Sequence, residues 1–530
     1  MTLDRRAVIG AGLAGLAGIP LIGRQSTAQA APMASTPYGK VRGSEADGIK
    51  IFKGIPYARA GRFLAPTAPV AWTEVRDTLV FGPMAPQPIR SVGSLFASWT
   101  FDKEVSEDCQ VLNIWTPGLR DNVKRPVMVW LHGGDFSSLS GSRNVYDGTR
   151  LCRKGDVVVV TLNHRLNAFG YLQLAELAPS FPDAGNAGML DIIAALKWVK
   201  DTIAEFGGDA GNVTIFGQSG GGAKVTNLMA MPAARGLFQK AIVQSGSYYL
   251  DAMSAAEGSK LAIALLTALD LGPGDVAKLA SLPMEKLIEG TEKAARGPAK
   301  ANYKPVVDGR NLPSGPWSPG APALSADIPM IIGTTATEMT LLTGGREPAT
   351  FNLDEAALRQ RIGAWFVPGD IDKVLATFKA GRPSATPSEL FFAIATDKAM
   401  REGAWQQAER KAAQKGAPVW FYELDWVTPV DGGKWGSPHS LDLAMMFDNV
   451  SLSAAMVGTG PEAQRVADQM SAAWLAFARN GNPNAPGVVQ WPPYDLASRA
   501  TMVFDASSRV VNDFRGDERT LLASLKPPTG

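Results

Sequence analysis

The chain contains Val213-Thr-Ile-Phe-Gly-Gln-Ser-Gly-Gly-Gly222, in which a short apolar run leads directly into a Gly-x-Ser-x-Gly motif. The apolar residues predict a buried β-strand, and the motif predicts a sharp turn from that strand into a helix. In such a turn the serine backbone is strained, and close contacts favour glycine at the positions that Gly217 and Gly221 occupy. We therefore predict that Ser219 is a catalytic nucleophile; the alternative is an ordinary serine in a glycine-rich turn.

Only three histidines occur in the 530 residues: His132, His164 and His439. In hydrolases built around this turn, the serine, the acid and the histidine follow one another in that order along the chain. His439 is the only histidine after Ser219, and it lies in a loop rich in glycine and proline, from which a side chain can reach another strand. We predict that His439 is the general base; the alternative is a structural or surface histidine.

The acid should be a carboxylate in a loop just past a strand, between Ser219 and His439, where it fixes the imidazole tautomer and stabilises its charged form. Glu338 fits this position, and Asp308 and Asp425 also flank strand-like runs. A solvated loop carboxylate or a helix cap would look the same in the sequence. The residue pattern alone leaves the three carboxylates open.

A second strand-like run, Arg125-Pro-Val-Met-Val-Trp-Leu-His-Gly-Gly-Asp-Phe136, also ends in a glycine pair. An oxyanion that develops during acyl transfer needs fixed N–H donors, and glycine lets the backbone come close enough to aim them. We predict an oxyanion hole formed by the amides of Gly134, Asp135 and Gly220. The alternative is a plain turn at the end of a strand.

Together these motifs resemble the type-B carboxylesterases, an α/β-hydrolase family that includes bacterial para-nitrobenzyl esterases and the cholinesterases. The resemblance spans nearly the whole chain after residue 30, and further matching stretches are Phe52-Lys-Gly-Ile-Pro-Tyr57, Ser106-Glu-Asp-Cys-Gln-Val-Leu-Asn113, Gly185-Asn-Ala-Gly-Met-Leu-Asp191, Pro305-Val-Val-Asp-Gly309, Pro329-Met-Ile-Ile-Gly-Thr-Thr-Ala-Thr-Glu338 and His439-Ser-Leu-Asp-Leu-Ala-Met-Met-Phe-Asp448. It implies that Glu338, rather than Asp308 or Asp425, is the acid. It also implies that Ser245 contacts this acid and that Glu107 pairs with Arg62.

Three positions depart from the family pattern. Gln218 stands where the family often has glutamate, so a negative charge beside the catalytic residues is absent. Asp135 stands where glycine or alanine is usual, and because a carboxylate facing an oxyanion would repel it, we expect its side chain to point away or to be paired. Cys109 matches a half-cystine of the family, but no cysteine precedes it. Whether it meets Cys152 is left open, since two buried thiols are equally compatible with the sequence.

Composition indicates a soluble enzyme rather than a protein that binds polyanions. The chain has 52 Lys and Arg against 50 Asp and Glu, a net charge of +2, and no long run of like charges, so nucleic acid is not an expected partner. The spacing of histidine, cysteine and aspartate offers no zinc site, and the chemistry predicted above requires no metal or organic cofactor. The expected partner is a small-molecule ester, while the oligomeric state is not indicated.

The first 30 residues read as a twin-arginine export signal. Arg5-Arg6 precedes an apolar stretch from Ala7 to Gly23, and Ala28-Gln-Ala30 resembles a cleavage site. We therefore expect a periplasmic or secreted protein without a membrane anchor. Within this stretch, Gly10-Ala-Gly-Leu-Ala-Gly15 matches G-x-G-x-x-G, but a dinucleotide site would need a preceding strand, a full helix and a following acidic residue, which are not convincing here.

Apolar runs that resemble strands alternate with helical patterns through residues 31–530, which we expect to form a single domain. The clearest helical pattern is Asp191 to Phe206. Such alternation predicts a mostly parallel sheet covered by helices on both faces, the α/β-hydrolase fold. Two helix-rich stretches, about 251–300 and 353–415, are expected to form a cap and a gorge wall. Trp435, Phe136 and Tyr248 could line that gorge or simply pack.

The predicted activity is hydrolysis of a small to medium carboxylic ester through an acyl-enzyme on Ser219, with His439 as acid and base. Two alternatives belong to other classes of protein. One is a non-catalytic adhesion or binding module on the same scaffold, against which the presence of Ser219, Glu338 and His439 argues. The other is an exported dinucleotide-dependent oxidoreductase that uses the glycines near the amino terminus.

Overall fold

The computed structural model describes residues 31–90, 93–101 and 103–525. Within these ranges the largest sheet has eleven strands in the order β16-β15-β14-β13-β10-β9-β7-β8-β6-β4-β3. Its parallel part consists of β8 (Val158–Leu162), β7 (Arg125–Leu131), β9 (Gly208–Gln218), β10 (Lys240–Gln244), β13 (Met330–Thr335), β14 (Val419–Leu424) and β15 (Thr501–Phe504). Antiparallel pairs complete both edges through β6 (Val111–Thr116), β4 (Ile49–Pro56), β3 (Ser44–Ala46) and β16 (Arg509–Val511).

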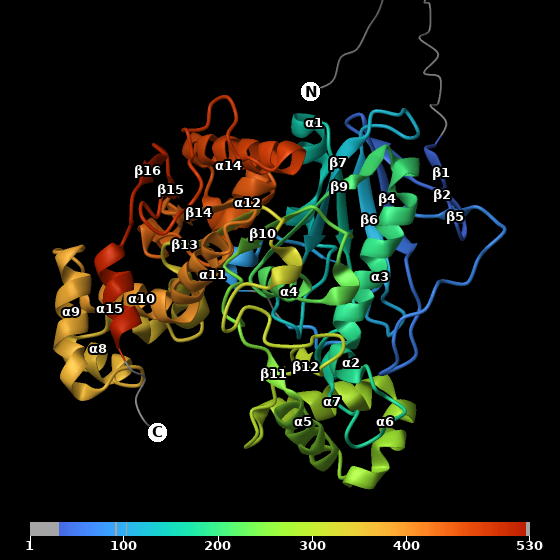
Figure 1. The fold of residues 1–530 in the computed structure, drawn as a ribbon, viewed down its shortest axis with the longest axis horizontal. Helices are drawn as coiled ribbons and strands as arrows, with labels where there is room; N and C mark the ends of the chain where they lie inside the picture. The colour runs from blue at the N-terminus through green and yellow to red at the C-terminus, as the bar shows by residue number, and fades with distance from the viewer. Residues whose placement is uncertain (1–30, 91–92, 102, 526–530) are drawn as a thin grey trace, which may run out of the picture. The chain divides into compact units, whose positions relative to one another are not determined.

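Helices cover both faces of this sheet (Figure 1). Alternate side chains of a strand point to opposite faces, so Val127, Val129 and Leu131 of β7 join one core while Met128 and Trp130 join the other. The first core includes side chains of α2 (Asn167–Tyr171), α3 (Ala187–Thr202) and α4 (Gly220–Leu228), and the second those of α1 (Thr149–Gly155), α12 (Leu441–Met446), α13 (Ala454–Val457) and α14 (Pro461–Asn480). Because both faces are covered, central strands such as β7 and β8 are buried along their whole length. The predicted α/β architecture is confirmed.

Two elements differ in extent from the sequence prediction. The helix expected over residues 191–206 begins earlier, at Ala187, and its last turn is a 3-10 helix that ends at Gly207, whose φ is +73°. The strand expected at Val213 extends from Gly208 to Gln218, since it pairs along β7 and β10. Partners that are distant in sequence therefore decide where these elements end.

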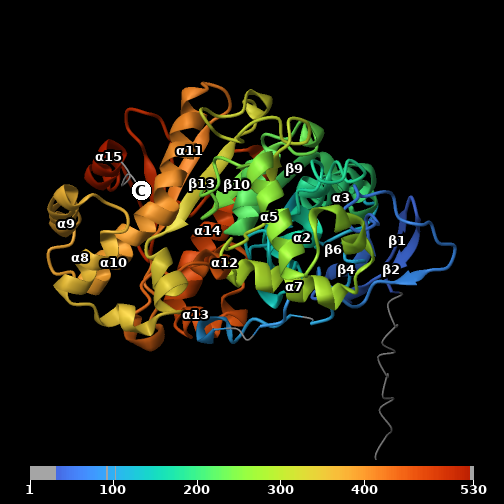
Figure 2. The same ribbon diagram turned by 90° about the horizontal axis from the view of Figure 1, so that it is seen from below.

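The two stretches expected to be helix-rich both contain helices. The first holds α5 (Ala255–Ala268), α6 (Val276–Ser281) and α7 (Met284–Arg296), of which α5 and α7 lie side by side (Figure 2). The second holds α8 (Glu355–Ile362), α9 (Ile371–Ala380), α10 (Pro387–Thr396) and α11 (Glu402–Ala413), and α15 (Gly516–Ser524) packs against α9. Their roles as cap and gorge wall stay predictions.

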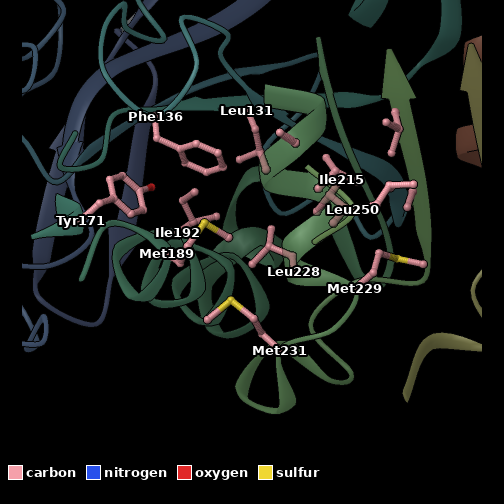
Figure 3. Packing of buried hydrophobic residues seen from close by; sticks show 14 of the residues in the cluster. Leu131, Phe136, Tyr171, Met189, Ile192, Ile215, Leu228, Met229, Met231 and Leu250 are labelled. Atoms are coloured by element: carbon pink, nitrogen blue, oxygen red, sulfur yellow. The ribbon is translucent and has the colours of Figure 1, made fainter. Parts of the chain in front are cut away.

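The core beneath α4 anchors the turn that carries the expected nucleophile. Figure 3 shows Leu228 and Met229 at the end of α4 in the same cluster of buried side chains as Leu131 and Ile215 of the sheet, and all four are almost fully buried. Each such side chain contributes about 1.5–3 kcal/mol when it is removed from water. This packing holds α4 firmly against β7 and β9, so the connection between β9 and α4 has little freedom to relax.

Smaller features complete the fold. A separate three-stranded sheet is formed by β1 (Met33–Thr36), β2 (Gly39–Arg42) and β5 (Arg76–Asp77), and a two-stranded one by β11 (Met253–Ser254) and β12 (Val306–Val307). Residues from Pro32 onward form one compact unit. Among the described residues, no helix has the length and apolarity needed to cross a bilayer. The predicted export signal, residues 1–30, lies outside the described residues.

The ion pair implied by the family resemblance is present. Arg62 Nε donates to Glu107 Oε2 at 2.9 Å, and Arg62 Nη1 donates to the carbonyls of Leu279 and Leu282 at 2.7 Å. This arginine therefore ties an early loop to the end of α6. Cys109 and Cys152, whose pairing the sequence left open, are both free buried thiols.

Candidate active site

Ser219 is the single residue between the end of β9 and the start of α4, and its backbone is strained. Its φ is 57° and its ψ is −128°, a combination that residues with a side chain rarely adopt. The Ser219 amide donates to Gln244 O at 2.8 Å, which holds the turn against β10. The strand-to-helix turn predicted from the sequence is therefore confirmed, and it presents the Ser219 side chain at the carboxyl end of the sheet.

Three glycines allow the backbones around this turn to approach one another. A Cβ on Gly217 would lie 2.4 Å from the carbonyl carbon of Gly221, and one on Gly221 would lie 1.9 Å from Leu131 O. A Cβ on Gly220 would lie 2.4 Å from the Asp135 amide nitrogen. No side chain fits at such distances, so the glycine pattern is a requirement of packing.

The loop from Gly133 to Asp135 lies directly beside Ser219. A Cβ on Gly133 would be 3.5 Å from Ser219 Cβ, and the amide of Asp135 borders Gly220. Gly134 and Asp135 both have positive φ, at 80° and 55°, which turns the chain sharply at the end of β7. The residues whose amides were predicted to form the oxyanion hole are thus brought together around Ser219; that they bind an oxyanion stays a prediction.

The unusual Asp135 carboxylate is paired, as expected. Tyr249 OH donates to Asp135 Oδ2 at 3.1 Å, and Asn302 Nδ2 lies 3.5 Å from the same oxygen. Burial raises the pKa of the Asp135 carboxyl, and the hydrogen bond from Tyr249 opposes that rise. These contacts hold the carboxylate on the side of the loop that faces Tyr249.

Lys224 supports this loop from below, a role that sequence reasoning missed. Its buried Nζ, in the second turn of α4, donates to His132 O at 2.9 Å and to Asp135 O at 2.8 Å. Burial lowers the pKa of Lys224 to about 7. A neutral amine still has two N–H donors, so both hydrogen bonds persist in either protonation state. The available signal was a lysine enclosed by apolar residues just after the turn.

Replacing Lys224 by methionine should release the loop. Two buried carbonyls then lose their donor, so we expect kcat for 4-nitrophenyl acetate to fall about tenfold and the free energy of unfolding to fall by about 1–3 kcal/mol. Steady-state kinetics and urea denaturation measure the two effects. Lys197→Met, at an exposed position of α3, should change neither. Equal kinetics for the Lys224 variant and the native chain would contradict the supporting role.

The stability difference should also depend on pH. Because the pKa of Lys224 is about 7 in the folded protein and 10.5 when unperturbed, the unfolded chain binds more protons between these values. Stability contributed by this group therefore rises with pH across that window. The gap between the native chain and Lys224→Met should accordingly widen from pH 7 to pH 10. A gap that stays constant over this range would contradict the assigned pKa.

Glu338 and His439 form a direct hydrogen bond. His439 Nδ1 lies 2.5 Å from Glu338 Oε2, while Ser245 Oγ and the Thr335 amide donate to Glu338 Oε1 at 2.5 and 2.9 Å. Burial pushes the pKa of Glu338 up, but the imidazole and these donors outweigh it and leave the pKa below its usual value. The carboxylate is therefore ionised and oriented toward His439, and the contact implied for Ser245 is confirmed.

The other two candidate acids, Asp308 and Asp425, contact residues other than His439. Asp308 accepts hydrogen bonds from the side chains of Asn186 and Asn311 at 3.0 and 2.9 Å. Asp425 lies 4.0 Å from Arg515. The geometry thus selects Glu338 from the three carboxylates that the residue pattern left open.

Gln218 occupies the position beside His439 Nε2 from which the Ser219 hydroxyl would donate its proton. Its Nε2 lies 3.2 Å from His439 Nε2, and its Oε1 accepts from Ser440 Oγ at 3.2 Å. The Tyr248 hydroxyl lies close to the Ser219 side chain; burial raises the pKa of Tyr248, and its contact with Ser219 lowers it. With the Nδ1 proton shared with Glu338, His439 Nε2 has a lone pair that accepts the Gln218 amide proton. A side-chain rotation is needed before Ser219 can take that position, as is common in enzymes without bound substrate.

The two remaining histidines are structural. The rings of His132 and His164 stack with centroids 5.1 Å apart, and both are buried. The Nδ1 atom of each lies 2.9 Å from the carbonyl oxygen of the following residue. Neither contacts Glu338, which agrees with the prediction of His439 as the base.

A cavity of about 810 Å³ borders the loop that contains Asp135. Its wall includes Ser137 and Ser138, whose amides donate to Gly134 O, and Asn302, which contacts Asp135. Trp435 lines this cavity, whereas Phe136 is fully buried against Tyr171. Tyr248 contacts Ser219 itself. The three aromatic residues that could line a gorge therefore have three different environments.

Comparison with known proteins gives consistent matches across the chain. A model described as "Carboxylesterase family" matches residues 30–520. A para-nitrobenzyl esterase of Bacillus subtilis is 35% identical over 506 residues, covering 93% of this chain and 98% of that protein. Phenmedipham hydrolase of Pseudarthrobacter oxydans is 31% identical over 510 residues, covering 93% and 99%. A crystal structure of a carboxylesterase from Geobacillus stearothermophilus has a TM-score of 0.80 at 38% identity, covering 92% of this chain and 99% of that one.

Proposed function

The chain belongs to the carboxylesterase family and is a serine hydrolase of carboxylic esters, and from this premise we propose that Ser219, His439 and Glu338 act as nucleophile, base and acid on a small to medium ester. The observation that carries the proposal is the 2.5 Å contact between His439 and Glu338 beside the strained Ser219. A carboxylate in this position fixes the tautomer in which the imidazole Nε2 can accept a proton.

The reaction proceeds in two acyl transfers. Once Gln218 withdraws, His439 Nε2 takes the Ser219 proton while the hydroxyl oxygen attacks the ester carbonyl. The amides of Gly134, Asp135 and Gly220 stabilise the tetrahedral anion. His439 then gives its proton to the departing alcohol, and a water molecule repeats the sequence to release the acid.

During this cycle Glu338 supplies the negative charge that stabilises the protonated His439. Proton transfer makes His439 an imidazolium, which the adjacent ionised Glu338 stabilises. Gln218, which lies on the opposite side of the imidazole, is neutral and adds no such stabilisation. The proposal therefore assigns the main electrostatic role to Glu338; the buried Asp442 carboxyl also interacts with His439, but burial raises the pKa of Asp442 to about 6.

Covalent labelling tests the nucleophile. A fluorophosphonate should inactivate the enzyme by adding one phosphonyl group per chain, and peptide mass spectrometry should locate that group on Ser219. Prior incubation with a slowly hydrolysed ester should protect against labelling. Modification at another residue, or full turnover after stoichiometric labelling, would refute the assignment, and complete lack of reaction would favour a binding module.

We also propose export through the twin-arginine route, supported by Arg5-Arg6 and the apolar stretch after it. In a bacterial host that has this pathway, the double substitution Arg5→Lys and Arg6→Lys should leave the uncleaved protein in the cytoplasm. Cell fractionation and the mass of the recovered chain measure this outcome. Unchanged export of the double variant would show that a different route is used.

A further inference from the structure

Arg143 lies in the wall of the cavity that borders the oxyanion loop, our name for residues 133–135. It belongs to the connection between β7 and α1, and only 6% of its surface is exposed. Burial lowers the pKa of its guanidinium from the usual value, although arginine remains charged at any physiological pH. The cavity wall therefore contains a buried positive charge, and the same cavity borders the loop beside Ser219.

Within residues 31–90, 93–101 and 103–525, this guanidinium has no carboxylate partner. In the part of the chain that the structure describes, no hydrogen bond or ion pair of the Arg143 side chain is recorded. Other buried arginines are paired: Arg165 Nη2 lies 2.7 Å from Asp191, and Arg401 Nε lies 2.9 Å from Glu423. Because a buried charge is costly without a partner, an unpaired one at a cavity wall indicates a group that a ligand supplies.

Aromatic rings hold the guanidinium in place instead. Its Cζ lies 5.8 Å from the Phe96 ring centroid and 5.2 Å from that of Phe101. Neither ring offers a conventional hydrogen-bond acceptor to the five N–H donors of the guanidinium. The rings therefore pack around Arg143 and leave its N–H donors available for a ligand.

The remaining charges of the cavity do not neutralise Arg143. Glu292, the acidic residue in the lining, lies 2.8 Å from Arg90. Lys300 and Arg346 add two exposed positive charges at the lining. The excess of positive charge attracts anions, and the low-dielectric walls strengthen that attraction. The apolar side chains of Leu95, Ile288 and Leu341 in the same wall suit a hydrocarbon segment.

We propose that the enzyme hydrolyses esters that carry a free carboxylate several carbons from the scissile bond, and that Arg143 binds this carboxylate through two parallel N–H···O hydrogen bonds. The planar fork of arginine matches a carboxylate in this way. The proposal rests on ester hydrolysis at Ser219, since Ser137 and Ser138 in the cavity wall hydrogen-bond to Gly134 of the loop beside that serine. Beyond ester hydrolysis itself, the proposal specifies the chemical class of the ester substrate.

A matched pair of esters tests the proposal. Mono-4-nitrophenyl adipate and 4-nitrophenyl hexanoate have acyl chains of equal length and differ in a terminal carboxylate. We expect the ratio of kcat/KM for the adipate to that for the hexanoate to fall by about 10- to 100-fold in Arg143→Gln, as for loss of a charge-assisted hydrogen bond. A second pair, 4-carboxyphenyl hexanoate and phenyl hexanoate, places the carboxylate on the alcohol side. The pair whose ratio falls identifies the side that occupies the cavity.

Each result is a ratio of kcat/KM values for two esters on the same variant. A general loss of activity therefore affects both values equally and cancels. Arg346→Gln removes the same charge at an exposed position and should change either ratio by less than about threefold because solvent screens it. Arg143→Lys keeps the charge but loses the fork, so it should give an intermediate ratio and serves if the glutamine variant does not fold. Ratios that are the same in the native chain and both Arg143 variants would overturn the proposal. Failure of the native enzyme on 4-nitrophenyl hexanoate would instead contradict the function proposed above.

Discussion

Replacing Ser219 by alanine is expected to lower kcat for a short-chain 4-nitrophenyl ester by about a million-fold, the effect typical of losing the nucleophile of a catalytic triad. The residual rate would come from the oxyanion donors and from substrate binding. Alanine keeps the backbone amide that donates to Gln244 O, and the glycines around the turn are untouched. The variant should therefore fold, with only the reacting oxygen removed.

Spectrophotometric assays at saturating substrate measure this loss, after purification excludes traces of native enzyme. Circular dichroism and a urea titration should show native-like secondary structure and cooperative unfolding. Ser281→Ala, which alters an exposed serine at the end of α6, should retain full activity. A decrease of less than about tenfold for Ser219→Ala would remove Ser219 from the mechanism.

The nucleophile and the base could be predicted from the sequence because one is identified by a short local motif and the other by its order along the chain. The glycines around Ser219 form a recognisable local pattern, although the contacts that require Gly220 and Gly221 are with Asp135 and Leu131, which lie far away along the chain. His439 follows from chain order and from the scarcity of histidine. The parallel centre of the sheet likewise follows from apolar runs alternating with helical patterns. These signals can be recognised in the sequence without knowing how distant segments meet.

Contacts between distant segments were the part that the sequence could not determine. Glu338 touches His439 across 101 positions, and nothing in the local pattern distinguishes it from Asp308 or Asp425. Arg143 lies among glycine and serine and resembles a surface arginine; its burial depends on Phe96 and Phe101 from another loop. Physical contact, rather than residue type, gives each of these side chains its role.

The same dependence on contact makes Glu338→Gln the most informative substitution at the acid. Oε1 of Glu338 accepts from the Thr335 amide, which cannot act as an acceptor, and from Ser245 Oγ. In the glutamine variant the side-chain oxygen must therefore stay at this position, and its –NH2 group must face His439 Nδ1. The imidazole can then meet that donor only by moving its own proton to Nε2.

An imidazole with a proton on Nε2 cannot accept the Ser219 proton, so we expect kcat at neutral pH to fall about 10⁴-fold while the fold is retained. Steady-state kinetics on the same 4-nitrophenyl ester measure the loss, and the rate of fluorophosphonate labelling of Ser219 should fall in parallel. Glu338→Asp keeps the charge and should retain more activity than the glutamine variant, although its shorter side chain weakens the contact. Because the amide differs from the carboxylate mainly in charge and in its protons, equal activity of Glu338→Gln and the native enzyme would show that another group sets the His439 tautomer.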